Sequence, residues 1–133
     1  MSATLPASIL ERLAGTAETP LRVFDTPPAP TTATPYVVVY FDSGVRSSDR
    51  ESDQRVTREH GWQTVTVGTS ASQARAAVDR VTAALEDWRP VVDGVTFSKV
   101  EHEGTQPVRR DPDMPDRVLF IATDQWRAVS DPV

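Results

Sequence analysis

The amino-acid sequence predicts an α+β fold, in which a mainly antiparallel or mixed four-stranded sheet carries one long helix on one face, together with a short N-terminal helix. Two observations support this prediction. Four segments have the composition of strands, and one of them is an unbroken run of β-branched and aromatic residues. Between the second and the third of these segments, apolar residues recur with helical spacing over several turns. The 133 residues are enough for one modest core, so we treat residues 1–133 as a single domain.

The N-terminal part predicts a short helix from Pro6 to Leu13. Thr4 can cap this helix, and a proline in the first turn lacks only an N–H that would be unpaired there anyway. Gly15 ends the helix, and the short apolar segment Leu21–Phe24 can form an edge strand. Residues 26–35 contain four prolines, so this Pro-rich segment is expected to run extended.

Two predicted strands flank a long charged segment. Tyr36–Phe41 is typical of a strand buried on both faces, whereas Trp62–Gly68 alternates as a half-buried strand does. Between Asp42 and Glu59 there are four arginines, five acidic residues and only two aliphatic side chains. Such a segment cannot bury itself, so we predict that residues 42–61 form a mobile charged loop in an antiparallel hairpin.

The predicted helix after Gly68 is the best-defined element of the sequence. Ser70 and Gln73 match a capping box, in which the Ser70 hydroxyl accepts the Gln73 N–H and the Gln73 side chain reaches back to the Ser70 N–H. A strand, a glycine, hydroxyl residues and a helix also make the layout of a phosphate-binding loop, but the second glycine and the lysine of such a loop are missing. We therefore predict a structural junction. The apolar stripe of the helix consists of Ala74, Val78, Val81, Leu85 and Trp88.

The C-terminal third predicts two more strands. Asp93-Gly94 marks a tight turn, and Val95–Glu103 follows as a third strand. Arg117–Val129 is the fourth strand, and a second charged loop, Gln106–Asp116, separates the two. The tryptophans Trp62, Trp88 and Trp126 are expected in the core or in an interface.

The composition weighs against several classes of function. The net charge is −5 and the isoelectric point is near 4.9, so sequence-independent binding to nucleic acid is not expected. The absence of cysteine excludes disulfides and thiolate metal sites. The N-terminus lacks the pattern of a secretory signal, and no segment approaches the length of a membrane span.

No catalytic, cofactor or metal site is predicted. In Glu101-His102-Glu103 the histidine points away from the two carboxylates on a strand, so the three cannot converge on one ion. The aspartates of the second charged loop lack the glycine and the bidentate glutamate of a calcium loop. A tight cluster of acid, base and nucleophile, as an enzyme of this size would need, is not apparent.

The order of motifs along the chain resembles the tail terminator (tail completion) proteins of long-tailed phages, particularly those of high-GC actinobacterial hosts. The resemblance covers about Ile9 to Ser130. Its motifs are, in order, a PYVVV strand, the long charged loop, a strand ending in VGTS, the helix start Gln73–Val81, the DG turn, RRDPD and a last strand of VLFIA.

This resemblance implies a small fold with a mixed sheet that closes into a homohexameric ring. In that family the ring caps the tail tube, stops its polymerisation and offers its other face to the head connector. The implied partners are further copies of the chain, the tail tube (major tail) protein and the head–tail connector protein, while DNA only passes through the lumen. The implied location is the head-proximal end of the tail in the virion, and the host cytoplasm during assembly. No cofactor and no membrane are implied.

A closed ring needs two different complementary patches on every subunit. We predict these patches from the charged loops, because arginine pairs bidentately with carboxylates at interfaces. One patch is Arg46, Arg50 and Arg55, and the other is Arg109, Arg110 and Asp111.

Two other classes of function stay open from the sequence. One is a cytosolic α+β ligand-binding or regulatory domain that uses the sheet face opposite the helix. The other is a small enzyme that uses His60 with carboxylates of the charged loop. A ring-sized particle in solution separates the first class from a terminator, and an activity lost on His60→Ala would support the second.

Overall fold

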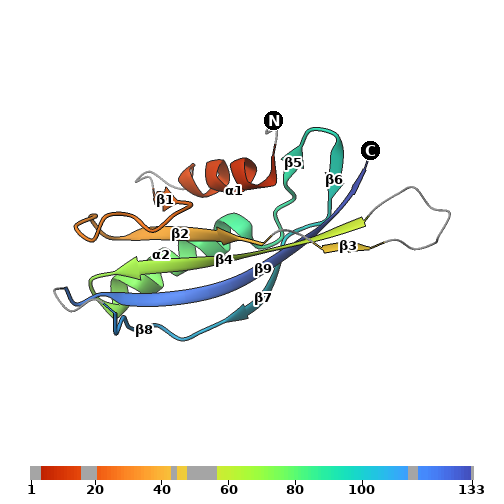
Figure 1. The fold of residues 1–133 in the computed structure, drawn as a ribbon. Helices are drawn as coiled ribbons and strands as arrows, with labels where there is room; N and C mark the ends of the chain where they lie inside the picture. The colour runs from red at the N-terminus through yellow and green to blue at the C-terminus, as the bar shows by residue number, and fades with distance from the viewer. Residues whose placement is uncertain (1–3, 16–20, 43–44, 48–56, 114–116, 133) are drawn as a thin grey trace.

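The computed structural model describes residues 4–15, 21–42, 45–47, 57–113 and 117–132. Within these residues the chain forms two helices, α1 (Leu5–Ala14) and α2 (Ala71–Leu85), and one curled, nine-stranded mixed sheet (Figure 1). The α+β class and the mixed sheet are therefore as predicted. None of the helices in the described ranges is long and apolar enough to cross a membrane.

Two long strands form the centre of the sheet. β4 (Thr57–Gly68) and β9 (Phe120–Pro132) pair antiparallel from Arg58–Ser130 to Gly68–Phe120. β1 (Arg22–Phe24) runs parallel to β2 (Tyr36–Phe41), and every other pairing is antiparallel. The remaining strands are β3 (Val45–Ser47), β5 (Val91–Val92), β6 (Val95–Phe97), β7 (Glu101–Thr105) and β8 (Arg109–Arg110). The path across the sheet is β1-β2-β4-β9-β6-β5, while β3 pairs with β4, and β7 and β8 pair with β9.

The sheet has more strands than the four predicted, because several strands are too short to show a sequence period. β5 and β8 have two residues each and β3 has three. The predicted third strand is also divided into β6 and β7, because Val100 between them pairs with the segment after α2 instead of with β9. The Val100 N–H donates to Trp88 O (2.7 Å), and Val100 O accepts the Asp87 N–H (3.1 Å). The fourth strand begins at Phe120 rather than Arg117 and continues to Pro132.

The expected charged loop at 42–61 is shorter than predicted. β4 starts at Thr57, so the last five residues of that range belong to the central strand, and β3 pairs with them. The Thr57 hydroxyl donates to the Asp131 carboxylate (2.6 Å), which fixes the start of β4 against β9. Residues 43–44 and 48–56 lie outside the described residues, and the mobility of the loop stays a prediction.

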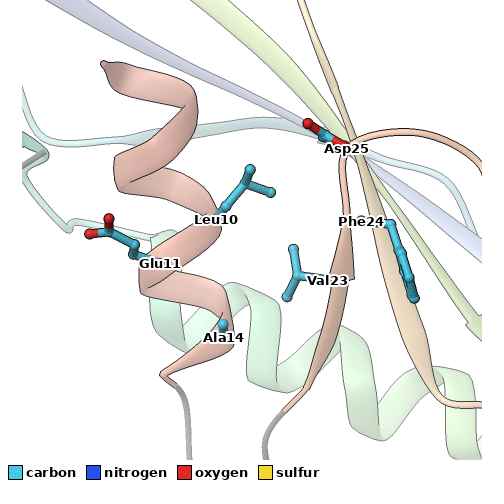
Figure 2. A pocket seen from close by; sticks show the side chains of 6 residues that line it. All are labelled: Leu10, Glu11, Ala14, Val23, Phe24 and Asp25. Carbon is cyan, nitrogen blue, oxygen red and sulfur yellow. The ribbon is translucent and has the colours of Figure 1, made fainter. Parts of the chain in front are cut away.

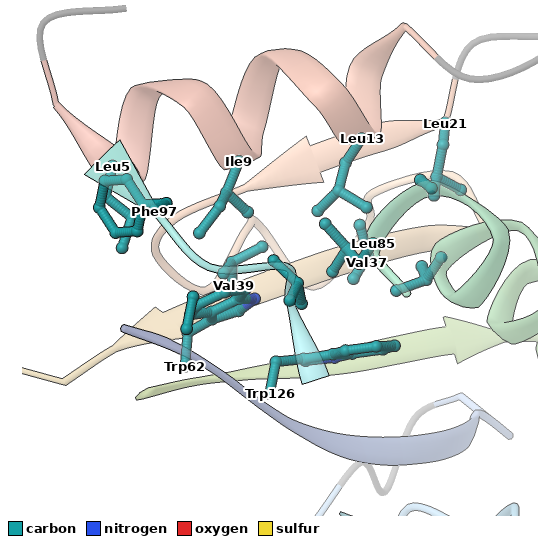
Figure 3. Packing of buried hydrophobic residues seen from close by; sticks show 14 of the residues in the cluster. Leu5, Ile9, Leu13, Leu21, Val37, Val39, Trp62, Leu85, Phe97 and Trp126 are labelled. Atoms are coloured by element: carbon teal, nitrogen blue, oxygen red, sulfur yellow. The ribbon is translucent and has the colours of Figure 1, made fainter. Parts of the chain in front are cut away.

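Both helices cover the same face of the sheet and bury one core against it (Figure 3). Thr4 caps α1 as predicted, because its hydroxyl accepts the Ala7 N–H (3.2 Å), and Gly15 is the C-cap. Trp62 and Trp126 face each other across β4 and β9, and each is 1% exposed. The side chains that α1 contributes are Leu5, Ile9 and Leu13, and they point toward Val37, Val39 and Trp62 in Figure 3.

The apolar stripe of α2 is confirmed at Ala74, Val81 and Leu85, which are buried, but it extends to one side of the predicted line. Ala77 and Ala84 are buried against the sheet, whereas Val78 is partly exposed. The helix ends at Leu85, so Trp88 follows it instead of extending the stripe. Trp88 still packs on the core, where the Arg12 guanidinium lies over its ring (5.4 Å) and Arg12 Nε donates to Ala84 O (2.9 Å). These contacts join α1 to α2.

The other sheet face carries a smaller apolar cluster. Tyr36, Val38, Val67 and Leu119 are buried there. The Pro-rich segment is tied to the chain before β9 by Arg117, which donates to the carbonyl oxygens of Pro30 (2.6 Å) and Thr32 (3.0 Å).

Candidate interaction surfaces

The junction between β4 and α2 has the structural role that the sequence predicts. The Ser70 hydroxyl accepts the Gln73 N–H (3.0 Å). The Gln73 side chain reaches back as expected but to a different residue, because its Oε1 accepts the Thr69 N–H (2.7 Å) and the Thr69 hydroxyl (3.0 Å) rather than the Ser70 N–H. A Cβ on Gly68 would lie 2.7 Å from Ala74 N, so the glycine is needed for the close approach of the helix. These contacts fix the turn between β4 and α2.

His60 is engaged with the core rather than with a catalytic group. Its Nε2 lies 2.8 Å from the Ser130 hydroxyl, and its ring contacts Phe97 (5.4 Å between centroids). Burial lowers the pKa of His60, and the positive charge of Arg58 lowers it further. Ser130 is only 4% exposed, so an external substrate cannot reach its hydroxyl. Within the described ranges, no carboxylate hydrogen-bonds to His60.

The Glu101-His102-Glu103 segment places its charges on two faces, as predicted for a strand. His102 Nε2 lies 2.8 Å from Asp124 Oδ1 on the helix-covered face, and its ring stacks on Trp126 (4.4 Å). On the opposite face Arg127 forms ion pairs with Glu101 (3.9 Å) and Glu103 (3.3 Å), and also with Glu59. In the part of the chain that the structure describes, no group of three or more potential ligands is arranged to hold a metal ion.

One of the two predicted interface patches, at residues 109–111, lies wholly within the described residues. Arg109 and Arg110 form β8 and are both exposed. Asp111 follows them, donates its N–H to Leu119 O (2.7 Å) and accepts the Asp113 N–H on its carboxylate (2.9 Å). Its negative charge also reaches Tyr36, whose pKa is raised by burial and by Asp111 against the opposing effect of Arg117.

The other predicted patch is not assembled by the described residues. Arg46 lies on β3, where its backbone pairs with Arg58. Arg50 and Arg55 lie outside the described residues. The role of all six residues in an interface therefore stays a prediction.

A groove between α1 and β1 was not predicted. It is an open depression with a volume of about 420 Å³, lined by Leu10, Glu11 and Ala14 of α1 and by residues 23–25. Leu10 and Val23 point toward each other across it (Figure 2). Both are only partly buried, and the acidic residues Glu11 and Asp25 on its lining are exposed. The sequence signal was weak: Leu10 is an apolar residue beside the stripe of α1 that meets the core.

The two outer strands β1 and β8 lie at opposite ends of one row across the sheet. The pairings join Arg22 to Tyr36, Tyr36 to Val67, Val67 to Ile121 and Ile121 to Arg109. Among the described strands, β1 pairs only with β2 and β8 only with β9. Two different strand edges are therefore left without a partner among the described strands, one beside the α1–β1 groove and the other bearing two arginines.

Comparisons with known proteins agree with this fold. The model of the family described as tail completion protein gp17 matches residues 7–123. A chain in the solved structure of the virion of a native gene transfer agent (GTA) particle superposes with a TM-score of 0.76 at 21% sequence identity, covering 96% of this chain and 94% of that chain. At this identity the likeness establishes the fold alone. No curated protein matches the sequence.

Proposed function

Since the chain belongs to the family of the tail completion protein gp17, we propose that it forms a homohexameric ring that caps the tail tube, ends its polymerisation and joins the tail to the head connector. The family consists of structural tail proteins and not of enzymes, so the chain is a structural protein of a phage tail. The family match over residues 7–123 is the observation that carries the proposal. It also confirms the family that the order of motifs indicates.

The arrangement of the two free edges supports a ring. A closed ring repeats one heterologous interface by rotation, so every subunit must present two different patches that fit each other. The edges of β1 and β8 are different and lie at opposite ends of the row of paired strands. A subunit of this kind can bind one neighbour on each side.

The net charge of −5 supports a lumen through which DNA passes. A negative surface repels phosphate groups, so the ring offers the DNA no sequence-independent binding site. The partners in this proposal are further copies of the chain, the tube protein and the connector protein. The ring is placed at the head-proximal end of the tail, after assembly in the host cytoplasm.

The alternative of a cytosolic ligand-binding or regulatory domain predicts a monomer or small oligomer with a binding site on the sheet face opposite the helices. The groove described above lies elsewhere, between α1 and β1. Light scattering on the purified protein distinguishes the two functions, because a ring of six 14.6 kDa subunits is far larger than a monomer. A protein that stays monomeric at every concentration would favour the alternative.

The decisive experiment removes the protein from an infection. Loss of a tube cap and joint should leave filled heads beside unattached tails of uncontrolled length, which electron microscopy of the lysate can count. Restoring the gene on a plasmid is the control and should return joined particles with tails of one length. Tails of normal length joined to heads in the absence of the protein would refute the proposal.

A further inference from the structure

We propose that neighbouring subunits join by extending the sheet, so that β8 of one copy pairs antiparallel with the outer edge of β1 of the next copy and sets Asp111 opposite Arg22. This inference rests on the proposed ring and names the interface that closes it. The occupant of the α1–β1 groove is therefore a second copy of this chain.

The direction of the strands allows this pairing without a change of fold. β1 is parallel to β2, β2 is antiparallel to β4, and β4 is antiparallel to β9. β8 is antiparallel to β9, so it also runs antiparallel to β1 of its own subunit. Rotation about an axis close to the strand direction preserves that direction, and β8 of a neighbour therefore meets β1 antiparallel. Unpaired strand edges are the ordinary template for such additions.

The α1–β1 groove fits an added strand. α1 packs beside β1 on the helix-covered side and Val23 points into the space between them (Figure 2). A strand that pairs with β1 lies under α1 and places every second side chain in the groove. The groove offers Leu10 and Val23 for apolar contact, and Asp25 on its lining carries negative charge. The RRD segment at β8 brings positive charge to this side of the sheet.

Matching faces restrict the register. Arg22 and Phe24 lie on the open face and Val23 on the helix-covered face, because they pair with Tyr36, Val38 and Val37. On β8, Arg109 shares the open face with Ile121, and its neighbour Arg110 lies on the other. In a continuous sheet, residues opposite each other share a face, so the allowed registers differ by two residues.

Charge selects one of these registers. In the level register, β8 of the neighbour continues the row of paired residues without a shift. Arg109 then lies opposite Arg22, which places like charges together. A shift of two residues sets Asp111 opposite Arg22, so that opposite charges meet, and Arg110 opposite Val23 on the side of the groove. The opposite shift places Pro107, which has no N–H, opposite Arg22. The first shift is the register we assign.

The chain contains no cysteine, so engineered disulfides report this contact without background. Directly opposite residues have Cβ atoms about 4.5–5.5 Å apart, within reach of a disulfide, whereas residues displaced by two along the strand are about 7–8 Å apart. R22C/D111C tests the assigned register, and R22C/R109C is the matched control for the level register. The single variants R22C and D111C control for random collision.

Under mild oxidation, R22C/D111C should form disulfide-linked multimers up to the full ring on a non-reducing gel, about tenfold faster than R22C/R109C, in keeping with the difference in Cβ separation. Circular dichroism of each reduced variant verifies folding, and the light-scattering mass of the wild-type protein is measured in parallel. Rings without selective linkage of R22C/D111C would overturn the pairing and leave the proposed function intact. A wild-type protein that never leaves the monomer would overturn both.

Discussion

The indole N–H of Trp126 donates a hydrogen bond to the hydroxyl of Thr64 (2.9 Å), from β9 to β4 in the middle of the buried core. Thr64 is fully buried, and so is Thr66 two residues further along the same face. The two threonines differ in one respect: among the described residues, the Thr66 hydroxyl has no hydrogen-bond partner. They form a natural pair for testing what this buried hydrogen bond contributes.

Thr64→Val should therefore destabilise the protein by about 1–2 kcal/mol, because it leaves the buried Trp126 N–H unpaired. Thr66→Val removes a buried hydroxyl that has no partner, so it should be neutral or stabilising by up to about 1 kcal/mol. Urea unfolding followed by tryptophan fluorescence measures both. Equal effects of the two substitutions would show that the Trp126 hydrogen bond does not determine the difference.

The stability of the protein should depend on pH through His60. Burial and Arg58 lower its pKa below the ordinary value of 6.5. Between the lowered pKa and 6.5 the unfolded chain binds more protons than the folded chain, so the free energy of unfolding increases with pH across this window. Stability is fully present above the window and is lost as the pH falls through it.

His60→Gln keeps a partner for the Ser130 hydroxyl but cannot take up the proton. The wild-type protein should lose more stability than this variant between about pH 8 and about pH 5. Every other side chain is the same in both proteins, so the difference between them isolates the contribution of His60. Parallel losses in the two proteins, measured by urea unfolding at each pH, would contradict the prediction.

Ser70→Ala should cost about 1 kcal/mol, because the Gln73 N–H at the start of α2 loses its acceptor. Ser72→Ala is a suitable control, since Ser72 is an exposed serine on the first turn of the same helix. If the junction is structural, phosphate or a nucleotide should leave the melting temperature of the wild-type protein unchanged. Saturable stabilisation by either ligand would instead show an anion site at this corner.

The features that the sequence predicts well are those that depend on neighbours along the chain. The Tyr36–Phe41 run forms β2 with the expected bounds, and Ser70 caps α2. The turn at Asp93-Gly94 joins β5 to β6, and Gly94 has the positive φ (80°) that such a turn requires. Each of these signals is contained in a few consecutive residues.

The features that the sequence does not predict depend on residues far apart in the chain. β8 has two residues and is a strand only because Ile121 and Phe120 of β9 pair with it. Ala77 is buried and Val78 only partly so, because the side of α2 that meets the sheet depends on its tertiary contacts. The α1–β1 groove likewise exists only once both elements are in place. Such features follow from tertiary packing, which can override local periodicity.

Charge reversal on β8 tests the function of the predicted patch that lies wholly within the described residues. Arg109 and Arg110 are exposed, so replacing both with glutamate should leave the free energy of unfolding within about 0.5 kcal/mol of the wild-type value. If the patch faces an acidic surface of a neighbour or partner, the same change should raise the concentration needed for ring formation at least about tenfold, because close charge pairs at interfaces contribute about 1.5 kcal/mol or more. Light scattering over a dilution series measures this shift.

Arg75→Glu, on an exposed position of α2 away from both free edges, is the control and should change neither quantity. If the variant with glutamate at both 109 and 110 assembles at the same concentration as the wild-type protein, β8 is not an interface.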